Sequence, residues 1–117
     1  MKTILVSAAI MISLIFTKDK LTGRWQTKPS EKGNITGVVF KIDNTFEGFI
    51  NKKPFTSGNY TLQDSVFSFV DNGCEGKRGV YTVIFFSNED SMRLVPISDS
   101  CTERRNGMSR LILGRVK

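Results

Sequence analysis

The chain has 117 residues, of which 39% are hydrophobic and 24% are charged, and its 17 Lys and Arg against 11 Asp and Glu give a net charge of +6. This length fits one compact domain and excludes a two-domain enzyme. The sequence contains no His and only two Cys, which excludes the residue sets of most zinc sites, of serine and cysteine triads and of His-based proton relays.

The first segment, residues 1–17, predicts a secretory signal. Lys2 precedes an uncharged run over 3–17 that is rich in Ile, Leu, Val and Ala, and charged residues begin at Lys18. A membrane-spanning helix needs about 20 apolar residues, so this run is short for a span and suits a signal peptide. No small-x-small triplet precedes Lys18, so an uncleaved segment is the alternative. We expect an exported protein, periplasmic or extracellular, with its mature domain over 18–117.

From residue 21 onward, short apolar or alternating runs are separated by turn residues, which is typical of an all-β protein. Eight runs predict eight strands, over residues 21–28, 35–43, 45–51, 56–63, 65–71, 78–87, 91–97 and 108–116. Asn, Asp, Gly and Pro mark the connections between them, including Asn51 to Pro54 and Asn106-Gly107. Nearly all connections have hairpin length, so we expect an up-and-down antiparallel order.

Alternation within the runs predicts which face is buried. Val38, Phe40 and Ile42 share one face of the second run, and Tyr60 and Leu62 share one face of the fourth. Eight strands with one apolar face can close on themselves, which removes the exposed edges of an open sheet. The sequence therefore predicts an all-β fold, an eight-stranded antiparallel up-and-down β-barrel.

The two cysteines, Cys74 and Cys101, make an even count, as one disulfide requires, and they support the export interpretation. The bridge would close a loop of about 28 residues, for which the chain-entropy estimate is about 3.5 kcal/mol. Two free buried thiols are the alternative.

A Gly-x-Trp motif, Gly23-Arg24-Trp25, opens the first predicted strand, and the likeness to a known family continues at 39–46, 58–60, 79–81 and 97–101. This pattern resembles the lipocalin-like (calycin) barrels, in particular the short bacterial exported type, over residues 21–116. In that family the tryptophan packs across one end of the barrel and an arginine from near the last strand lies over it. The resemblance gives Trp25 the first role and leaves Arg110 and Arg115 as candidates for the second.

An eight-stranded barrel is just wide enough for its own side chains to fill it or to hold one small ligand. The well-known small-molecule lipocalins are longer than this chain, so we favour a filled or nearly filled interior over an open cavity. The candidate cavity residues are Phe40, Phe46, Tyr60, Phe67, Phe69 and Phe85.

A disulfide would also gather four cations near one end of the barrel. Lys77 and Arg78 follow the first cysteine by three and four residues, and Arg104 and Arg105 follow the second by the same spacing. Acidic neighbours partly offset these charges. We predict a weak anion-binding rim here, with a screened mixed-charge loop as the alternative.

No catalytic constellation emerges from the acidic residues. Most of them fall in expected turn or outward-facing positions, namely Asp43, Asp64, Asp71, Glu75, Glu89, Asp90, Asp99 and Glu103. Glu47 and Asp99 are conceivable acids. We expect no enzymatic activity, no cofactor and no metal ion. Nucleic acid is not an expected partner either, because the aromatic residues follow the inward pattern rather than an exposed basic face.

These observations predict an exported, non-enzymatic, lipocalin-like barrel that binds a small apolar or amphipathic anionic molecule. The alternative is a protein-binding barrel with a filled interior, similar to the exported protease inhibitors of this size. The expected partners are accordingly a small hydrophobic or anionic ligand, or a protein. A membrane contact is expected only through segment 1–17, if that segment stays uncleaved.

Overall fold

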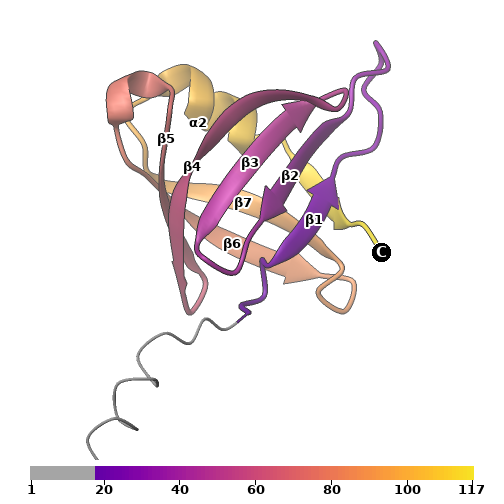
Figure 1. Cartoon of the computed structure of the whole chain (residues 1–117), viewed down its shortest axis with the longest axis horizontal. Helices are drawn as coiled ribbons and strands as arrows, with labels where there is room; N and C mark the ends of the chain where they lie inside the picture. The colour runs from indigo at the N-terminus through magenta and orange to yellow at the C-terminus, as the bar shows by residue number, and fades with distance from the viewer. Residues whose placement is uncertain (1–17) are drawn as a thin grey trace, which may run out of the picture.

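The computed structural model describes residues 18–117, in which eight antiparallel strands follow one another in chain order around a closed barrel (Figure 1). The strands are β1 (Gly23–Gln26), β2 (Thr36–Phe40), β3 (Thr45–Ile50), β4 (Lys53–Gln63), β5 (Val66–Asp71), β6 (Gly79–Phe86), β7 (Ser91–Ser98) and β8 (Ile112–Arg115). A short 3-10 helix, η2 (Cys74–Gly76), follows β5, and the helix α2 (Thr102–Ser109) connects β7 to β8. The predicted fold class is confirmed.

The predicted signal segment, 1–17, lies outside the described residues. Within 18–117, no helix has the length and apolar character that crossing a membrane would require.

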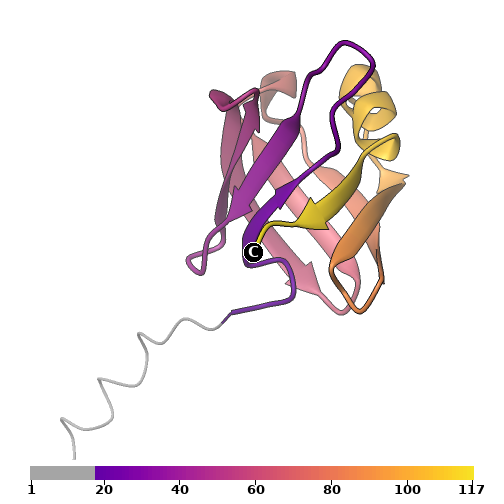
Figure 2. The ribbon, with the colours of Figure 1, turned by 90° about the vertical axis from the view of Figure 1, so that its right-hand side faces the viewer.

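The two ends of the barrel differ, as Figures 1 and 2 show. In an up-and-down barrel, alternate connections return to the same end. The connections β1–β2, β3–β4, β5–β6 and β7–β8 therefore share one end, which we call the α2 end because α2 lies there. The residues before β1 and the other three connections form the opposite end, which we call the N-terminal end.

Large apolar side chains from all eight strands and from the segment before β1 form the buried core of the barrel. The buried set is Leu21, Trp25, Phe40, Phe46, Tyr60, Phe67, Phe69, Tyr81, Val83, Met92, Leu94 and Leu113. Its aromatic rings interlock at centroid distances of 4.9 Å for the stacked pair Phe67 and Phe69 and 5.1 Å for the edge contact of Phe40 with Tyr60. Such offset and edge contacts add to the free energy gained from burying the rings.

The last predicted strand is wrong in part. The strand predicted over 108–116 begins only at Ile112, because Met108 and Ser109 belong to α2. The sequence of α2, Thr-Glu-Arg-Arg-Asn-Gly-Met-Ser, has no apolar stripe at helical spacing, and Asn106-Gly107 predicts a turn. The helix therefore gives no periodic signal in the sequence.

Two strand ends also differ from the prediction. Ile42 is 46% exposed, because β2 ends at Phe40 and Ile42 lies in the following turn. Pro54 lies inside β4 rather than in the preceding connection, next to a register shift between Gly48 and Phe49. A proline is tolerated in a strand at such an irregularity.

The N-terminal end is closed by the residues just before β1. Asp19 Oδ1 accepts hydrogen bonds from the backbone N–H groups of Leu21 (2.8 Å) and Thr22 (3.0 Å), and the Tyr60 hydroxyl donates to Asp19 Oδ2 (3.1 Å). This turn places Leu21 inside the barrel, where its side chain is fully buried.

Trp25 lies beside this plug and is also fully buried, with its indole Nε1–H donating to the Leu21 carbonyl at 2.8 Å. The guanidinium carbon of Arg115 lies 4.3 Å from the centre of the Trp25 rings. Of the two arginines left open by the sequence, Arg115 therefore takes this position. Arg110, five residues earlier, is the C-terminal cap residue of α2.

Candidate ligand pocket

A pocket of about 580 Å³ opens from the barrel interior toward the α2 end. Its floor consists of buried core side chains, including Phe40, Phe67 and Leu113, and its outer lining includes exposed Phe55 and Glu103. The pocket therefore extends from the core to the surface. At this end of the barrel the lining side chains leave this volume open, whereas the sequence favoured a filled or nearly filled interior.

The six predicted cavity aromatics divide between the two ends. Phe40, Phe46, Phe67 and Phe69 line the pocket. Tyr60 instead contacts Asp19 at the N-terminal end, as described above. Phe85 also lies at that end, with its ring 6.3 Å from Trp25 and the Lys20 ammonium 5.7 Å away.

The mouth of the pocket is shaped by the irregularity between β3 and β4. Gly48 pairs with Thr56 while Phe49 pairs with Pro54, so Phe55 is the extra residue of a bulge. The Phe55 ring lies close to the inward face of Gly48, at 3.4 Å from where a Cβ atom of residue 48 would stand. A bulge re-aims a side chain, and here it brings a 57% exposed aromatic ring to the rim of the pocket.

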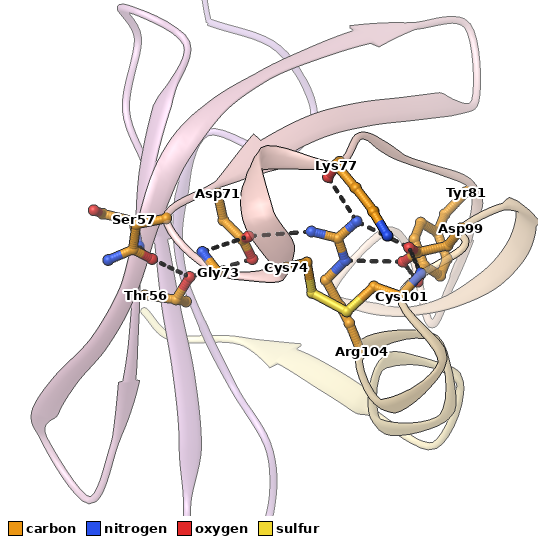
Figure 3. Close-up of polar contacts among 11 residues, drawn as sticks. Thr56, Ser57, Asp71, Gly73, Cys74, Lys77, Tyr81, Asp99, Cys101 and Arg104 are labelled. Atoms are coloured by element: carbon orange, nitrogen blue, oxygen red, sulfur yellow. Dashed lines mark hydrogen bonds and ion pairs between the residues drawn. A yellow bond between two sulfur atoms is a disulfide. The ribbon is translucent and has the colours of Figure 1, made fainter.

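Arg104 lies on one wall of the pocket between two carboxylates (Figure 3). Its Nε and Nη2 atoms each donate to Asp99 at 2.9 Å, and its Nη1 donates to Asp71 at 3.1 Å. Nη2 also donates to the carbonyl of Lys77 (2.9 Å), and the guanidinium carbon lies 4.8 Å from the centre of the Phe69 ring. Bidentate pairing of this kind is the strong form of a carboxylate–arginine contact.

Asp99 is the most buried acid of this cluster, at 4% exposure. Asp99 lies in the connection after β7, in keeping with the predicted turn position, but it is buried instead of facing solvent. Burial by itself would raise the pKa of Asp99, but hydrogen bonds from Arg104, from the Tyr81 hydroxyl and from the Cys101 backbone N–H hold it below its ordinary value. The same contacts with Asp99 raise the pKa of Arg104. Both groups are therefore charged at neutral pH.

Tyr81 points into the barrel from β6 and donates its hydroxyl hydrogen to Asp99. Burial, together with the hydrogen bond to this carboxylate, raises the pKa of Tyr81 far above its ordinary value. The hydroxyl stays protonated and acts as a fixed donor. Asp99 therefore receives donors on both carboxylate oxygens, and no buried side-chain polar atom in residues 18–117 lacks a partner.

The predicted disulfide between Cys74 and Cys101 is confirmed, and both cysteines line the pocket. It ties η2, in the β5–β6 connection, to the residue that caps α2. The disulfide and the contacts of Arg104 thus fix the same two connections. A disulfide is consistent with an oxidising location outside the reducing cytosol.

The four cations of the predicted anion rim are not equivalent. Lys77, Arg78 and Arg105 are exposed, whereas the Arg104 side chain is only 8% exposed and engaged by two carboxylates. Lys77 lies 3.8 Å from Glu75, and Arg78 donates to the Ser68 hydroxyl at 2.9 Å. Sequence reasoning did not identify the role of Arg104, because nothing in the local pattern shows that it turns inward.

Other polar groups of interest are dispersed. Glu47 is exposed and pairs with Lys41 at 3.4 Å, far in the chain from Asp99. Among residues 18–117, no group of three or more Cys, Asp or Glu is placed to hold a metal ion.

A second cleft, of about 840 Å³, lies between the β1–β2 connection and β8. Its lining includes Lys28, Arg110 and Ile112, and none of its lining residues is buried. Because it has no core face, we do not treat it as a ligand site.

No protein-family model matches this chain, and no curated protein matches it either. Its class therefore rests on architecture: a closed, eight-stranded, up-and-down antiparallel barrel with one plugged end and one end that holds a disulfide-bounded pocket.

Proposed function

We propose that this protein is an exported, lipocalin-like barrel that binds one small apolar or amphipathic anionic molecule in the pocket at the α2 end. The observation that carries the proposal is the pocket itself, whose volume of about 580 Å³ falls within the usual range for small-molecule sites. Its floor of aromatic and aliphatic side chains suits an apolar group.

The surroundings of the pocket support an amphipathic ligand. Polar residues of the lining, among them Thr56, Asn72 and Glu103, lie toward the rim together with Phe55, whereas the four buried Phe residues lie deeper, namely Phe40, Phe46, Phe67 and Phe69. A ligand with an apolar body and a polar end would match this division. Arg104 is already neutralised by Asp71 and Asp99, so an anionic end would be attracted by the exposed cations outside the pocket rather than by Arg104.

The resemblance to lipocalin-like barrels is supported by the position of Arg115 over Trp25 at the plugged end, which is the arrangement that the family pattern implies. The alternative is a protein-binding barrel, which requires only a rigid scaffold and a filled interior. The pocket favours binding of a small molecule over this alternative.

Native mass spectrometry of the exported protein from its secretion host, followed by titration with a fluorescent fatty acid, tests the proposal. A stoichiometric small molecule, or saturable uptake of the probe, is expected. Val38→Phe narrows the pocket and should weaken probe binding by more than about tenfold, whereas Val66→Phe adds the same ring at a 39% exposed position outside it and should change binding less than about twofold. A bare protein that takes up no probe would overturn the proposal.

A further inference from the structure

Positive charge is concentrated at one end of the barrel. The α2 end, residues 27–35, 51–53, 71–78 and 99–111, carries nine Lys and Arg against five Asp and Glu. The N-terminal end, residues 18–22, 41–44, 64–65, 87–90 and 115–117, carries five of each. The end that holds the pocket is therefore the basic end.

The two ends also differ in how their cations are paired. At the N-terminal end Lys20, Lys41, Arg115 and Lys117 each lie within 2.9 to 3.6 Å of a carboxylate. At the α2 end four lysines make no ion pair with any residue of 18–117: Lys28 and Lys32 in the β1–β2 connection, Lys52 in the β3–β4 turn, and Lys53 at the start of β4. Their charges remain available to an external anion.

These four lysines belong to one surface. The Asn51 side chain donates to Asn34 Oδ1 at 2.8 Å and accepts from the Ile35 N–H at 2.9 Å, which ties the β3–β4 turn to the β1–β2 connection. Figures 1 and 2 show both connections at the α2 end, where the β1–β2 connection projects farther than the β3–β4 turn.

Two apolar side chains lie among these lysines. Ile50 ends β3 and is 39% exposed, and Phe55 is 57% exposed at the rim of the pocket. We call the set Lys28, Lys32, Ile50, Lys52, Lys53 and Phe55 the hairpin-tip patch. Exposed apolar side chains surrounded by unpaired cations are the composition of a surface that inserts into the interface of an anionic bilayer.

We propose that the hairpin-tip patch docks the α2 end of the barrel onto an anionic lipid surface. The lysines supply attraction to the headgroups, and Ile50 and Phe55 enter the headgroup region. Docking in this orientation turns the mouth of the pocket toward the bilayer, where amphipathic molecules reside. The plugged N-terminal end, with balanced charges and four of its five cations in ion pairs, faces away. This inference stands on the surface alone and does not require the pocket to be occupied.

Co-sedimentation with vesicles tests the proposal. The protein should bind phosphatidylcholine vesicles that contain about one third phosphatidylglycerol, should bind pure phosphatidylcholine much less, and should be released by salt. Lys52→Glu with Lys53→Glu should lower the partition coefficient by more than about tenfold. Arg24→Glu with Arg93→Glu makes the same change in net charge on the exposed barrel wall and should lower it by less than about threefold.

A second pair of variants tests the contribution of the apolar side chains to vesicle binding. Ile50→Ser should lower partition into the anionic vesicles by about threefold or more, whereas Ile42→Ser, at an exposed position of the opposite end, should not. If the two charge-reversal pairs lowered the partition coefficient equally, net charge alone would account for the attraction, and the proposal would be overturned. Binding of a single-stranded oligonucleotide as tight as vesicle binding, together with no effect of Ile50→Ser, would assign the patch to polyanions instead.

Uptake of the fluorescent fatty acid without vesicles separates this proposal from the proposed binding of a small molecule in the pocket. Neither Lys52 nor Lys53 lines the pocket, so the charge-reversed protein should still take up the probe. Loss of vesicle binding with retained uptake supports docking, whereas retained vesicle binding overturns it whatever the uptake.

Discussion

Arg104 donates two hydrogen bonds to the carboxylate of Asp99, each 2.9 Å long, from its Nε and Nη2 atoms. The side chains of this pair are 8% and 0% exposed. Further hydrogen bonds from the same guanidinium reach Asp71 and the Lys77 carbonyl. One arginine from α2 thus joins the ends of β5 and β7 and the β5–β6 connection, and fixes one wall of the pocket.

Removal of this arginine should be strongly destabilising. Arg104→Ala leaves Asp99 as a buried, uncompensated charge, for which a loss of about 3 kcal/mol in the free energy of unfolding is expected. Arg105→Ala, at the exposed neighbouring position, should change it by less than about 0.5 kcal/mol. Urea unfolding of both variants measures the difference, and comparable losses would contradict a special role of Arg104.

Stability should fall in acid partly through Asp99. The pKa of Asp99 is lower in the folded protein than its ordinary value of 3.8, so the unfolded chain binds more protons between the two values. The stabilisation is fully present above about pH 4 and is lost as the pH falls through the folded pKa. Asp99→Asn should flatten the acid limb of unfolding free energy against pH. Some slope should remain, because the pKa values of Asp43 and Asp90 are also lowered. If the acid limb of the Asp99→Asn variant matched that of the wild type, Asp99 would not contribute to the loss of stability in acid.

The contact of Arg115 with Trp25 should stabilise the plugged end. Arg115→Ala removes the cation over the indole and the hydrogen bonds that Nη2 donates to the carbonyls of Lys20 (3.0 Å) and Glu89 (3.1 Å). A loss of about 2 kcal/mol in unfolding free energy is expected, with a shift in Trp25 fluorescence. Arg110→Ala is the control and should stay within about 0.5 kcal/mol of the wild type.

The disulfide should contribute about 3.5 kcal/mol, the chain-entropy value for its loop, whose ends are 27 residues apart. Cys74→Ser with Cys101→Ser should lower the unfolding free energy by about that amount. A reductant should lower the stability of the wild type to a similar level and leave the double variant unchanged. Equal stability of wild type and variant under oxidising conditions would contradict this prediction.

Substitution by alanine at two glycines should change the free energy of unfolding in opposite directions. A Cβ atom at position 58 would lie 1.9 Å from the Val70 carbonyl oxygen, so Gly58→Ala must push β4 from β5 and should cost about 2 kcal/mol or more. A Cβ atom at position 107 meets no atom within 4 Å, inside α2, so Gly107→Ala should raise the unfolding free energy by about 0.5 to 1 kcal/mol. Thermal unfolding of both variants shows whether each is less or more stable than the wild type.

The barrel itself could be predicted because each strand carries its own signal. In the β4 segment, Tyr60 and Leu62 alternate with polar residues, and a turn residue, Asp64, follows directly. Strand pairing in an up-and-down order needs only neighbours in the chain. The helix α2 could not be predicted in this way, because it buries none of its residues and so has no apolar stripe to reveal it.

The sequence by itself determined the eight strands, their antiparallel order, the closure of the barrel and the disulfide, because alternation, turn residues and an even cysteine count are local or pairwise properties. Only the tertiary structure decided that Arg104 turns inward to Asp99, that Arg115 rather than Arg110 covers Trp25, and that one end of the barrel is plugged by Leu21 while the other holds a pocket. These features depend on which side chains from distant segments meet at each end of the barrel. The spacing of residues along the chain does not predict these contacts.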